Sequence, residues 1–221
     1  MTGASAYDGH VDPHGAIAVR TLPALQISKR SVGPMDNNAY LLRCISTGDA
    51  LLIDAASDAD ALLDMVGSTP LRYVLTTHQH GDHWQALEDV VGATDALTIA
   101  HPKDAAGLPV ATATTVEDGD TITLGGVTLS VIHLRGHTPG SIAIRYDDPR
   151  GHPHLFTGDS LFPGGPGKTA GVEQFTSLLD DLQARVFDVL PDDTWVYPGH
   201  GDDTTLGAER PHLAEWRARG W

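Results

Sequence analysis

The order of secondary-structure signals along these 221 residues predicts a layered α/β sandwich, in which helices cover the faces of β-sheets. Three observations indicate this fold class. Strand-like and helix-like runs are mixed along the chain, polar residues gather directly after several strands, and no repeat or change of composition marks a linker. Because 41% of the residues are hydrophobic, one large core is expected. We therefore predict a loose N-terminal arm over residues 1–16 and a single domain over residues 17–221.

The first half of the chain opens with a predicted meander of strands. Apolar runs separated by turn signals at Gly33-Pro34 and Thr47-Gly48-Asp49 predict three strands, over residues 25–32, 38–45 and 50–54. Apolar residues at helical spacing then predict a helix over residues 58–66, with Ser57 or Asp58 as its N-cap. Another strand, over residues 73–76, follows.

This last strand leads into the densest group of metal-ligand side chains in the sequence. Residues 77–84 read THQHGDHW, which places four potential ligands within six positions: His78, His80, Asp82 and His83. Residues 84–91 have helical spacing, so the four ligands lie on a strand-to-helix turn. A turn can direct successive side chains at an ion, and zinc takes imidazole and carboxylate ligands at about 2.0 to 2.2 Å. We expect His78 and His80 to share one ion, and Asp82 and His83 to point to a second.

The second half of the chain continues the mixture of strands and helices. Apolar or alternating runs predict strands over residues 97–101, 127–134, 142–146, 155–157 and 194–197. The strongest amphipathic helix carries a stripe of Phe175, Leu178, Leu182, Val186 and Val189. Residues 103–107 predict a short turn or helix and residues 213–219 a closing helix, whereas Gly and Pro over residues 163–171 argue against regular structure.

Composition excludes several classes of function. The formal net charge is −15 at pH 7, whereas nucleic-acid and anionic-membrane partners require a basic face, so we expect neither partner. No apolar run approaches 18 residues, and the N-terminus lacks the pattern of a signal peptide, so we expect a soluble, cytoplasmic protein that acts on a small molecule. The single cysteine, Cys44, lies in an apolar run and is expected to pack as a small hydrophobic residue. The sequence does not predict the oligomeric state.

Three further potential ligands follow predicted strands. His137 in RGHTPGS, Asp159 in TGDSLF and His200 in YPGHG each lie beside glycine, which lets the backbone approach an ion closely. With the cluster, they complete a set of seven His and Asp side chains. The other histidines beyond the arm lack this context and are assigned to structural or surface roles: His101, His133, His152, His154 and His212.

The motifs HQHGDH, GHTPGS, GDSLF and PGHG, in this order, resemble the metallo-β-lactamase superfamily, and within it the glyoxalase II-like (hydroxyacylglutathione hydrolase-like) hydrolases. The resemblance spans about residues 25–207. It implies a four-layer αββα sandwich whose site lies at one edge between the two sheets. It also implies the ligand sets: His78, His80 and His137 for one ion, Asp82, His83 and His200 for the other, and Asp159 bridging both.

The chemistry implied by this resemblance is that of a hydrolase with a binuclear site and a bridging hydroxide, with Asp82 and Asp159 as catalytic residues. Two divalent ions are expected, zinc first, with iron or manganese as alternatives because these donors accept all three. A hydroxide shared by two ions is available near neutral pH, so no protein nucleophile is required. Asp159 stands where antibiotic-hydrolysing members typically carry Cys or Ser, which favours thioesters, lactones or related small esters as substrates.

Substrate-binding residues are less firmly indicated. The stretch GGPGKT resembles the glyoxalase II segment whose lysine contacts a substrate carboxylate, which implies that role for Lys168; the alternative is a surface lysine in a loop. Phe162 and Tyr197 are candidates for the pocket or for the core. The resemblance also departs from the family, because glutathione-specific members carry a C-terminal helical extension and this sequence ends soon after His200.

Two other interpretations remain open. A mononuclear-iron persulfide dioxygenase shares the fold and binds iron through the positions of His78, His137 and Asp159, which makes an oxidoreductase the main alternative. A non-catalytic metal-binding or scaffolding domain is disfavoured, because Asp82 has little structural use outside such a site. Metal content separates the first two, since the hydrolase requires two ions and the dioxygenase one iron.

Overall fold

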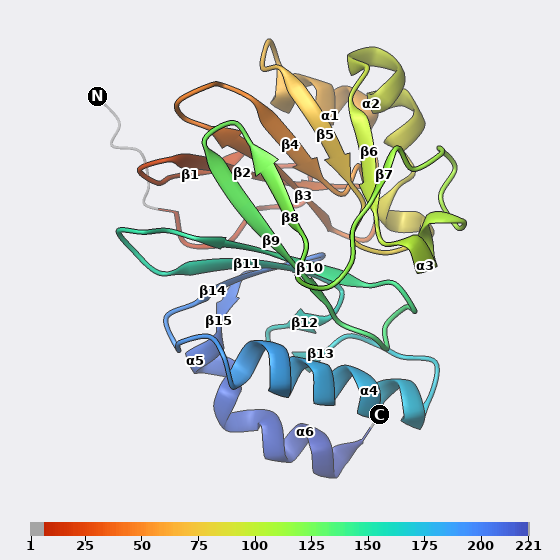
Figure 1. Ribbon diagram of the computed structural model, residues 1–221, viewed down its shortest axis with the longest axis vertical. Coiled ribbons are helices and arrows are strands. Elements are labelled where there is room, and N and C mark those ends of the chain that lie inside the picture. The colour runs from red at the N-terminus through yellow and green to blue at the C-terminus, as the bar shows by residue number, and fades with distance from the viewer. Residues whose placement is uncertain (1–6, 221) are drawn as a thin grey trace.

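The computed structural model describes residues 7–220. Within this range two β-sheets pack face to face and helices cover both outer faces, so the predicted four-layer αββα sandwich is confirmed (Figure 1). The first sheet has seven strands in the described chain, in the order β1-β2-β3-β4-β5-β6-β7. These strands are β1 (Ala18–Thr21), β2 (Leu25–Val32), β3 (Asn37–Cys44), β4 (Ala50–Ile53), β5 (Leu71–Leu75), β6 (Leu97–Ala100) and β7 (Thr114–Thr115).

The second sheet has six strands within residues 7–220, in the order β15-β14-β11-β10-β9-β8. Its strands are β8 (Thr121–Leu124), β9 (Val127–His133), β10 (Ile142–Asp147), β11 (Pro153–Gly158), β14 (Trp195–Pro198) and β15 (Thr204–Thr205). A separate small hairpin joins β12 (Leu161–Phe162) to β13 (Gly165–Pro166).

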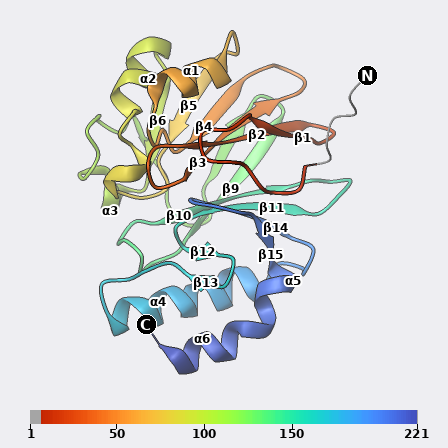
Figure 2. The same ribbon diagram turned by 180° about the vertical axis from the view of Figure 1, so that it is seen from behind.

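Helices form the two outer layers. Helices α1 (Ala59–Val66) and α2 (Leu87–Thr94) lie on the first sheet, while α4 (Val172–Leu182) and α6 (Leu213–Arg219) lie on the second, as the front and back views agree (Figures 1 and 2). Two shorter helices lie in connections: α3 (Pro102–Ala105) between β6 and β7, and α5 (Leu206–Glu209) between β15 and α6. The part of the chain that the structure describes has no helix long and apolar enough to cross a membrane.

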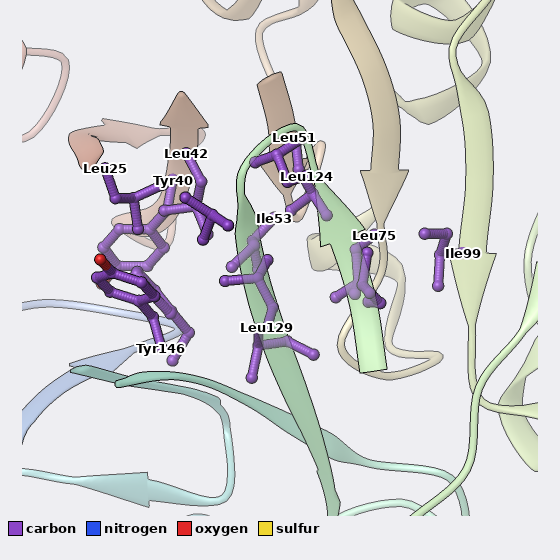
Figure 3. Close-up of a cluster of buried hydrophobic side chains, with 14 of the residues drawn as sticks. Leu25, Tyr40, Leu42, Leu51, Ile53, Leu75, Ile99, Leu124, Leu129 and Tyr146 are labelled. Carbon is purple, nitrogen blue, oxygen red and sulfur yellow. The ribbon is translucent and has the colours of Figure 1, made fainter. Parts of the chain in front are cut away.

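The main core lies between the two sheets. Inward-facing side chains of β2, β3 and β4 meet those of β8, β9 and β10, and Figure 3 shows this cluster with Ile53 and Leu129 near its centre. One further hydrophobic cluster lies under the helices of each outer layer. Burial of apolar area on both faces of both sheets therefore stabilises the strand order that positions the loops at the sheet edges.

Strand direction brings the loops of interest to one edge of the sandwich. Strands β4, β5 and β6 are parallel, and β9, β11 and β14 also run in a common direction. The two sheets are joined at the carboxyl ends of these strands, where the Ile142 amide donates to the Thr77 carbonyl at 3.0 Å and the Asn38 amide to the Gly199 carbonyl at 2.8 Å. Loops that follow six different strands therefore meet at one place.

The predicted helix stripe ending at Val189 was wrong at its last position. Helix α4 ends at Leu182 and continues as a π-helical turn over Gln183–Phe187, in which the Asp188 amide donates to the Gln183 carbonyl. The wider turn shifts the helical register, so Val189 is 60% exposed. Phe187 and Leu190 are buried instead.

Two local predictions also differ from the structure, and a third is confirmed in position but not in its capping bond. Helix α2 begins at Leu87 rather than at residue 84, because the Gln85 and Ala86 amides donate to the carbonyls of residues 56 and 55 instead of continuing a helix. Asp58 occupies the N-cap of α1 without a capping bond, since its carboxylate accepts from the Gly33 amide. The segment predicted to be irregular contains strand β13, which pairs with β12 through a turn at Gly164, whose φ is +88°.

The predicted N-terminal arm is only partly described, since residues 1–6 lie outside the described range. The part that follows contacts the body of the protein: the Tyr7 hydroxyl donates to Asp203 at 2.6 Å, and the buried Lys29 ammonium donates to the Gly9 carbonyl at 2.8 Å. Val11 is buried, whereas His10 and His14 are exposed. The described part of the arm is thus anchored by specific contacts.

Candidate metal centre

The seven predicted ligands lie together at the shared edge of the two sheets. His78, His80, Asp82 and His83 are on the segment between β5 and α2, with the last two in a single 3₁₀ turn, Gly81–His83. His137 follows β9, Asp159 follows β11 and His200 follows β14. Residues more than one hundred positions apart in the sequence therefore form one group.

Three imidazoles form the first ligand group. The Nε2 atom of His137 lies 2.9 Å from Nδ1 of His80 and 3.2 Å from Nε2 of His78. Ligands about 2.0 to 2.1 Å from a tetrahedral ion lie about 3.3 Å from one another, close to these separations. Three ring nitrogens can therefore face one ion from three sides.

The second ligand group contains Asp82, His83 and His200. Nε2 of His200 lies 3.2 Å from Nε2 of His83 and 3.3 Å from Oδ2 of Asp82, and Nε2 of His83 lies 3.5 Å from the same oxygen. The separations again match a set of ligands around one cation. Both predicted groups are thus assembled by the fold.

Asp159 lies between the two groups. Its Oδ1 is 3.3 Å from Nε2 of His83, and its Oδ2 is 3.4 Å from Nε2 of His200 and 3.6 Å from Nε2 of His137. Oδ1 is buried and has no hydrogen-bond partner among the described residues, a costly state for a carboxylate unless a cation compensates it. A side chain at Gly199 would place its Cβ 2.1 Å from this oxygen, so glycine is required there.

Hydrogen bonds on the far side of four rings leave the inward nitrogens free for a metal. Nδ1 of His83 lies 2.8 Å from Asp54, that of His78 lies 3.0 Å from the Thr77 hydroxyl, and those of His137 and His200 face the carbonyls of Lys168 and Met35 at 2.6 and 2.9 Å. With a proton on each Nδ1, the lone pair of each Nε2 points inward. Metal-binding histidines are typically held in this way.

Two buried carboxylates hold the loops themselves. Asp54, at the end of β4, accepts from the amide and the hydroxyl of Thr77 as well as from His83. Asp104, in α3, accepts from the Gln79 amide at 3.0 Å and from the Gly140 amide at 2.7 Å. Asp104 therefore joins the loop of His78 and His80 to the loop of His137.

The electrostatics differ between the two groups in the metal-free protein. Burial lowers the pKa of His78 and of His137. Burial also acts on His83, but Asp54 and Asp159 outweigh it and raise its pKa to about 10. Burial raises the pKa of Asp159, yet the adjacent His200 and His83 rings outweigh it and hold that pKa well below its usual value. The centre thus contains an ionised carboxylate that attracts cations.

These observations together fit two divalent ions. The donors are imidazole nitrogens and carboxylate oxygens, which zinc, iron and manganese accept. The ligand spacing, the orphaned Asp159 oxygen and the outward hydrogen bonds are independent of one another and agree. The described chain therefore contains His and Asp groups able to hold metal ions.

The remaining candidate residues have different positions. Lys168 is exposed on the segment beside His137, whose ring donates to its backbone carbonyl. Phe162 is half-buried with its ring centroid 6.2 Å from that of His200, whereas Tyr197 is fully buried in the core. His101 and His133 stack on each other in the interior, and His154 is buried, in agreement with their predicted structural roles.

Three residues that contact the ligands or their loops were not predicted from the sequence: Asp54, Asp104 and Asn37. Asn37 is buried, and its amide donates to Oδ2 of Asp82 at 2.9 Å. Asp54 carried a recognisable signal, since it directly follows a buried strand as Asp159 does. Asp104 and Asn37 carried no such signal, because their partners are distant in the sequence.

Comparisons with known proteins agree with this geometry. The profile of the metallo-beta-lactamase superfamily matches residues 32–200. The hydroxyacylglutathione hydrolase of Polaromonas sp. is 37% identical over 166 residues, which cover 74% of this chain and 62% of that protein. The chain spans less than two thirds of the length of the curated hydroxyacylglutathione hydrolases that it matches.

Solved structures are similar over most of the chain. ETHE1 from Myxococcus xanthus is 29% identical with a TM-score of 0.73, covering 85% of this chain and 82% of that one. The di-iron-bound form of TTHA1623 is 32% identical with a TM-score of 0.67, covering 82% of this chain and 96% of that one. With its fold, its HxHxDH turn and this match over most of its length, the chain belongs to the metallo-beta-lactamase superfamily.

Proposed function

We propose that this protein is a two-metal hydrolase of thioesters, similar to glyoxalase II, with related small esters and lactones as further substrates. The observation that carries the proposal is the position of Asp159 between two complete ligand groups, with one oxygen facing His83 and the other facing His137 and His200. The similarity to hydroxyacylglutathione hydrolases supports the same substrate class. Zinc is the proposed ion, and iron is the first alternative because a solved relative holds two irons.

Two ions held by these residues would lower the pKa of a bound water and would polarise the substrate carbonyl. The protein contributes orientation. Asn37 donates to Oδ2 of Asp82, the same oxygen that faces His83 and His200, so Oδ1 would remain to accept a hydrogen bond from the nucleophilic water. Asp82 thereby has a role in orienting the nucleophile as well as in holding an ion.

The composition of the site suits a leaving group that departs without a proton donor. The side chains that converge there are imidazoles and carboxylates committed to metal binding. A thiolate, whose conjugate acid has a pKa of about 8.5, leaves without general acid catalysis, whereas an amine does not. Thioesters are therefore favoured over amides.

Lys168 is the proposed contact for a negatively charged part of the substrate. Its backbone carbonyl accepts from the His137 ring, which places the residue next to the first ligand group, and its side chain is exposed. A cation there would attract an anionic substrate to a protein whose net charge is −15.

The test is metal content measured on protein purified without chelator, combined with hydrolysis of S-lactoylglutathione and of a panel of thioesters and lactones. About two ions per chain with turnover supports the hydrolase. One tightly bound iron without hydrolysis contradicts it.

That second result would favour a persulfide dioxygenase, the oxidoreductase alternative. Its supporting observation is that His78, His137 and Asp159 also lie together, with Nε2 of His137 3.2 Å from His78 and 3.6 Å from Asp159. Oxygen uptake by the iron-loaded protein with glutathione persulfide tests this alternative directly.

A further inference from the structure

A groove of about 430 Å³ borders the first ligand group at His137. Its walls are the segment around His137, the start of α3 and the first turns of α4. Because His137 belongs both to the groove and to the first ligand group, a substrate with its carbonyl at the metals can extend one arm into the groove. The remaining question is which chemistry the walls select.

The walls carry an excess of positive charge. Lys103 and Arg135 line the groove against one acidic residue, Glu173, whereas the whole sequence has 29 acidic and 14 basic residues. Because Asp181 offsets the charge of Arg135 from outside the lining, the preference for an anion rests on the exposed Lys103 ammonium and on the edge of the Arg135 guanidinium that Asp181 does not use. Gln174 and Ser177 add polar groups along the same wall.

Arg135 is fixed before any ligand binds. Asp181, which is buried and lies outside the groove lining, accepts from Nε of Arg135 at 2.7 Å and from Nη2 at 2.6 Å, and also from the Arg135 amide at 2.9 Å. This pair uses one edge of the guanidinium and leaves Nη1 for another partner. A preorganised cation loses less conformational entropy on binding an anion than a mobile one does.

We propose that this groove binds a carboxylate-bearing arm of the substrate, with Lys103 and Arg135 as its cationic contacts. The proposal rests on the proposed hydrolase function and extends it, because it assigns an anionic subsite separate from Lys168. The carboxylate can belong to the thiol carrier or to the acyl group. The arrangement predicts that charge in the groove controls substrate binding and leaves the chemical step unchanged.

Charge-neutralising variants of opposite sign provide the kinetic test. With a carboxylate-bearing thioester at low ionic strength, Lys103→Gln is expected to raise KM about fivefold, and Glu173→Gln to lower it about twofold, with kcat unchanged in both. Arg150→Gln, on the exposed turn between β10 and β11 at the far end of the second sheet, is the matched control and should leave KM unchanged. Both shifts should shrink at high salt, because exposed charges are screened.

Three thioesters identify the source of the carboxylate. S-lactoylglutathione carries it on the thiol, a succinyl thioester of 2-mercaptoethanol carries it on the acyl group, and a lactoyl thioester of 2-mercaptoethanol carries none. The KM effects should appear with one of the first two and disappear with the third. If the wild type hydrolyses these compounds but the variants change KM equally for all three, or for none, the groove assignment is wrong.

Direct binding separates this inference from the proposed function. The metal-loaded protein is titrated with glutathione and, separately, with succinate, while the amide NMR signals of Gly136, Ala170 and Gln174 are followed. At least one of the two should shift these signals, with about fivefold weaker binding to Lys103→Gln. Absence of hydrolysis with such shifts would overturn the hydrolase and retain the anionic groove; absence of shifts with both compounds would overturn the groove.

Discussion

The two ligand groups are built on different supports. His80, in the first group, is exposed, and His137 is held by a backbone carbonyl of the glycine-rich segment at Lys168. In the second group His83 is completely buried and its ring is paired with the buried carboxylate of Asp54. The two groups therefore differ at particular members: His80 reaches solvent and His137 borders the groove, whereas the ring of His83 is held by a buried carboxylate.

A buried ion pair strengthens this contrast. Lys29 and Asp203 are both 0% exposed, and the Lys29 ammonium donates to Asp203, to the Gly9 carbonyl and to the Gly201 carbonyl at 2.7 to 2.8 Å. All three of its donors are used, one of them on the residue that follows His200. The contrast teaches that buried charges support the second group at His83 and next to His200, while the first group keeps one exposed ligand, His80.

Removing the residue shared by both groups should have the largest effect. Asp159→Asn retains the shape of the side chain but loses the charge that faces both groups, so about one ion or fewer should remain bound and kcat/KM should fall about a thousandfold. Metal analysis and thioester hydrolysis measure this change. Asp188→Asn, on an exposed position, is the control. Retention of two ions and full activity by Asp159→Asn would show that the groups do not depend on a common ligand.

Breaking the buried Lys29–Asp203 ion pair should destabilise the fold around the segment that carries His200. Lys29→Met leaves Asp203 charged and buried without its cation, which costs about 3–5 kcal/mol of the free energy of unfolding. Urea denaturation measures this loss. Lys29→Met combined with Asp203→Asn should recover part of it, because neither charge is then buried alone. If the double variant is less stable than the single one, the pair is not the source of the effect.

Most of the fold and the convergence of the seven proposed ligands were predictable because their signals are local. Period-two and helical patterns gave β2 and α6 with the observed bounds, and ligands directly after strands indicated a common sheet edge. The start of α2 and the π turn after α4 were missed, since tertiary hydrogen bonds and a change of helical register decide them. The short strand β15 was missed because its pairing with β14 stabilises it, whereas its own two-residue sequence carries no strand pattern.

Supporting residues were harder to predict than ligands. Asp104 and Asn37 act on partners more than twenty positions away, and one sequence contains no record of such contacts. Lys29 shows the same limit, because a lysine in a strand normally predicts an exposed position. The pattern of ligands identifies the site, whereas the difference between its two halves is visible only in three dimensions.

Variants of the two loop-holding carboxylates should weaken one ligand group each. Asp54→Asn is expected to lower affinity for the second ion about 10- to 100-fold, because His83 loses the charged partner that orients it. Asp104→Ala should lower affinity for the first ion about tenfold, because the Gln79 and Gly140 amides lose their common acceptor.

Stepwise chelator competition, with the two ions followed separately, measures both variants. The sign of the difference is the informative result: Asp54→Asn should spare the first ion and Asp104→Ala the second. Equal loss of both ions in either variant would mean that the centre behaves as a single cooperative unit through Asp159, and the contrast between the two halves would not extend to metal affinity.

The smallest expected effect concerns the pH dependence of the Arg135–Asp181 pair, which supports the loop of the first group. Burial raises the pKa of Asp181, but the Arg135 guanidinium outweighs it and lowers that pKa below its usual value. The unfolded chain therefore binds a proton at a higher pH than the native protein does, and the stability from the pair is present above about pH 4, the unfolded pKa. It is lost as pH falls through the lower, native pKa.

Because the Arg135 side chain is 50% exposed, solvent screening limits the contribution to about 1 kcal/mol. Urea unfolding of metal-free wild type and Asp181→Asn should therefore differ by about that amount at pH 7, and the difference should shrink below pH 4 and in 1 M salt. If the difference in unfolding free energy between the two proteins stays constant with pH, the ionised carboxylate is not its source. The His137 loop would then be supported by hydrogen bonds of residue 181 that do not depend on charge. In that case the charges of the Arg135–Asp181 pair would contribute nothing to holding the His137 loop, and buried Asp104 would remain its charged support.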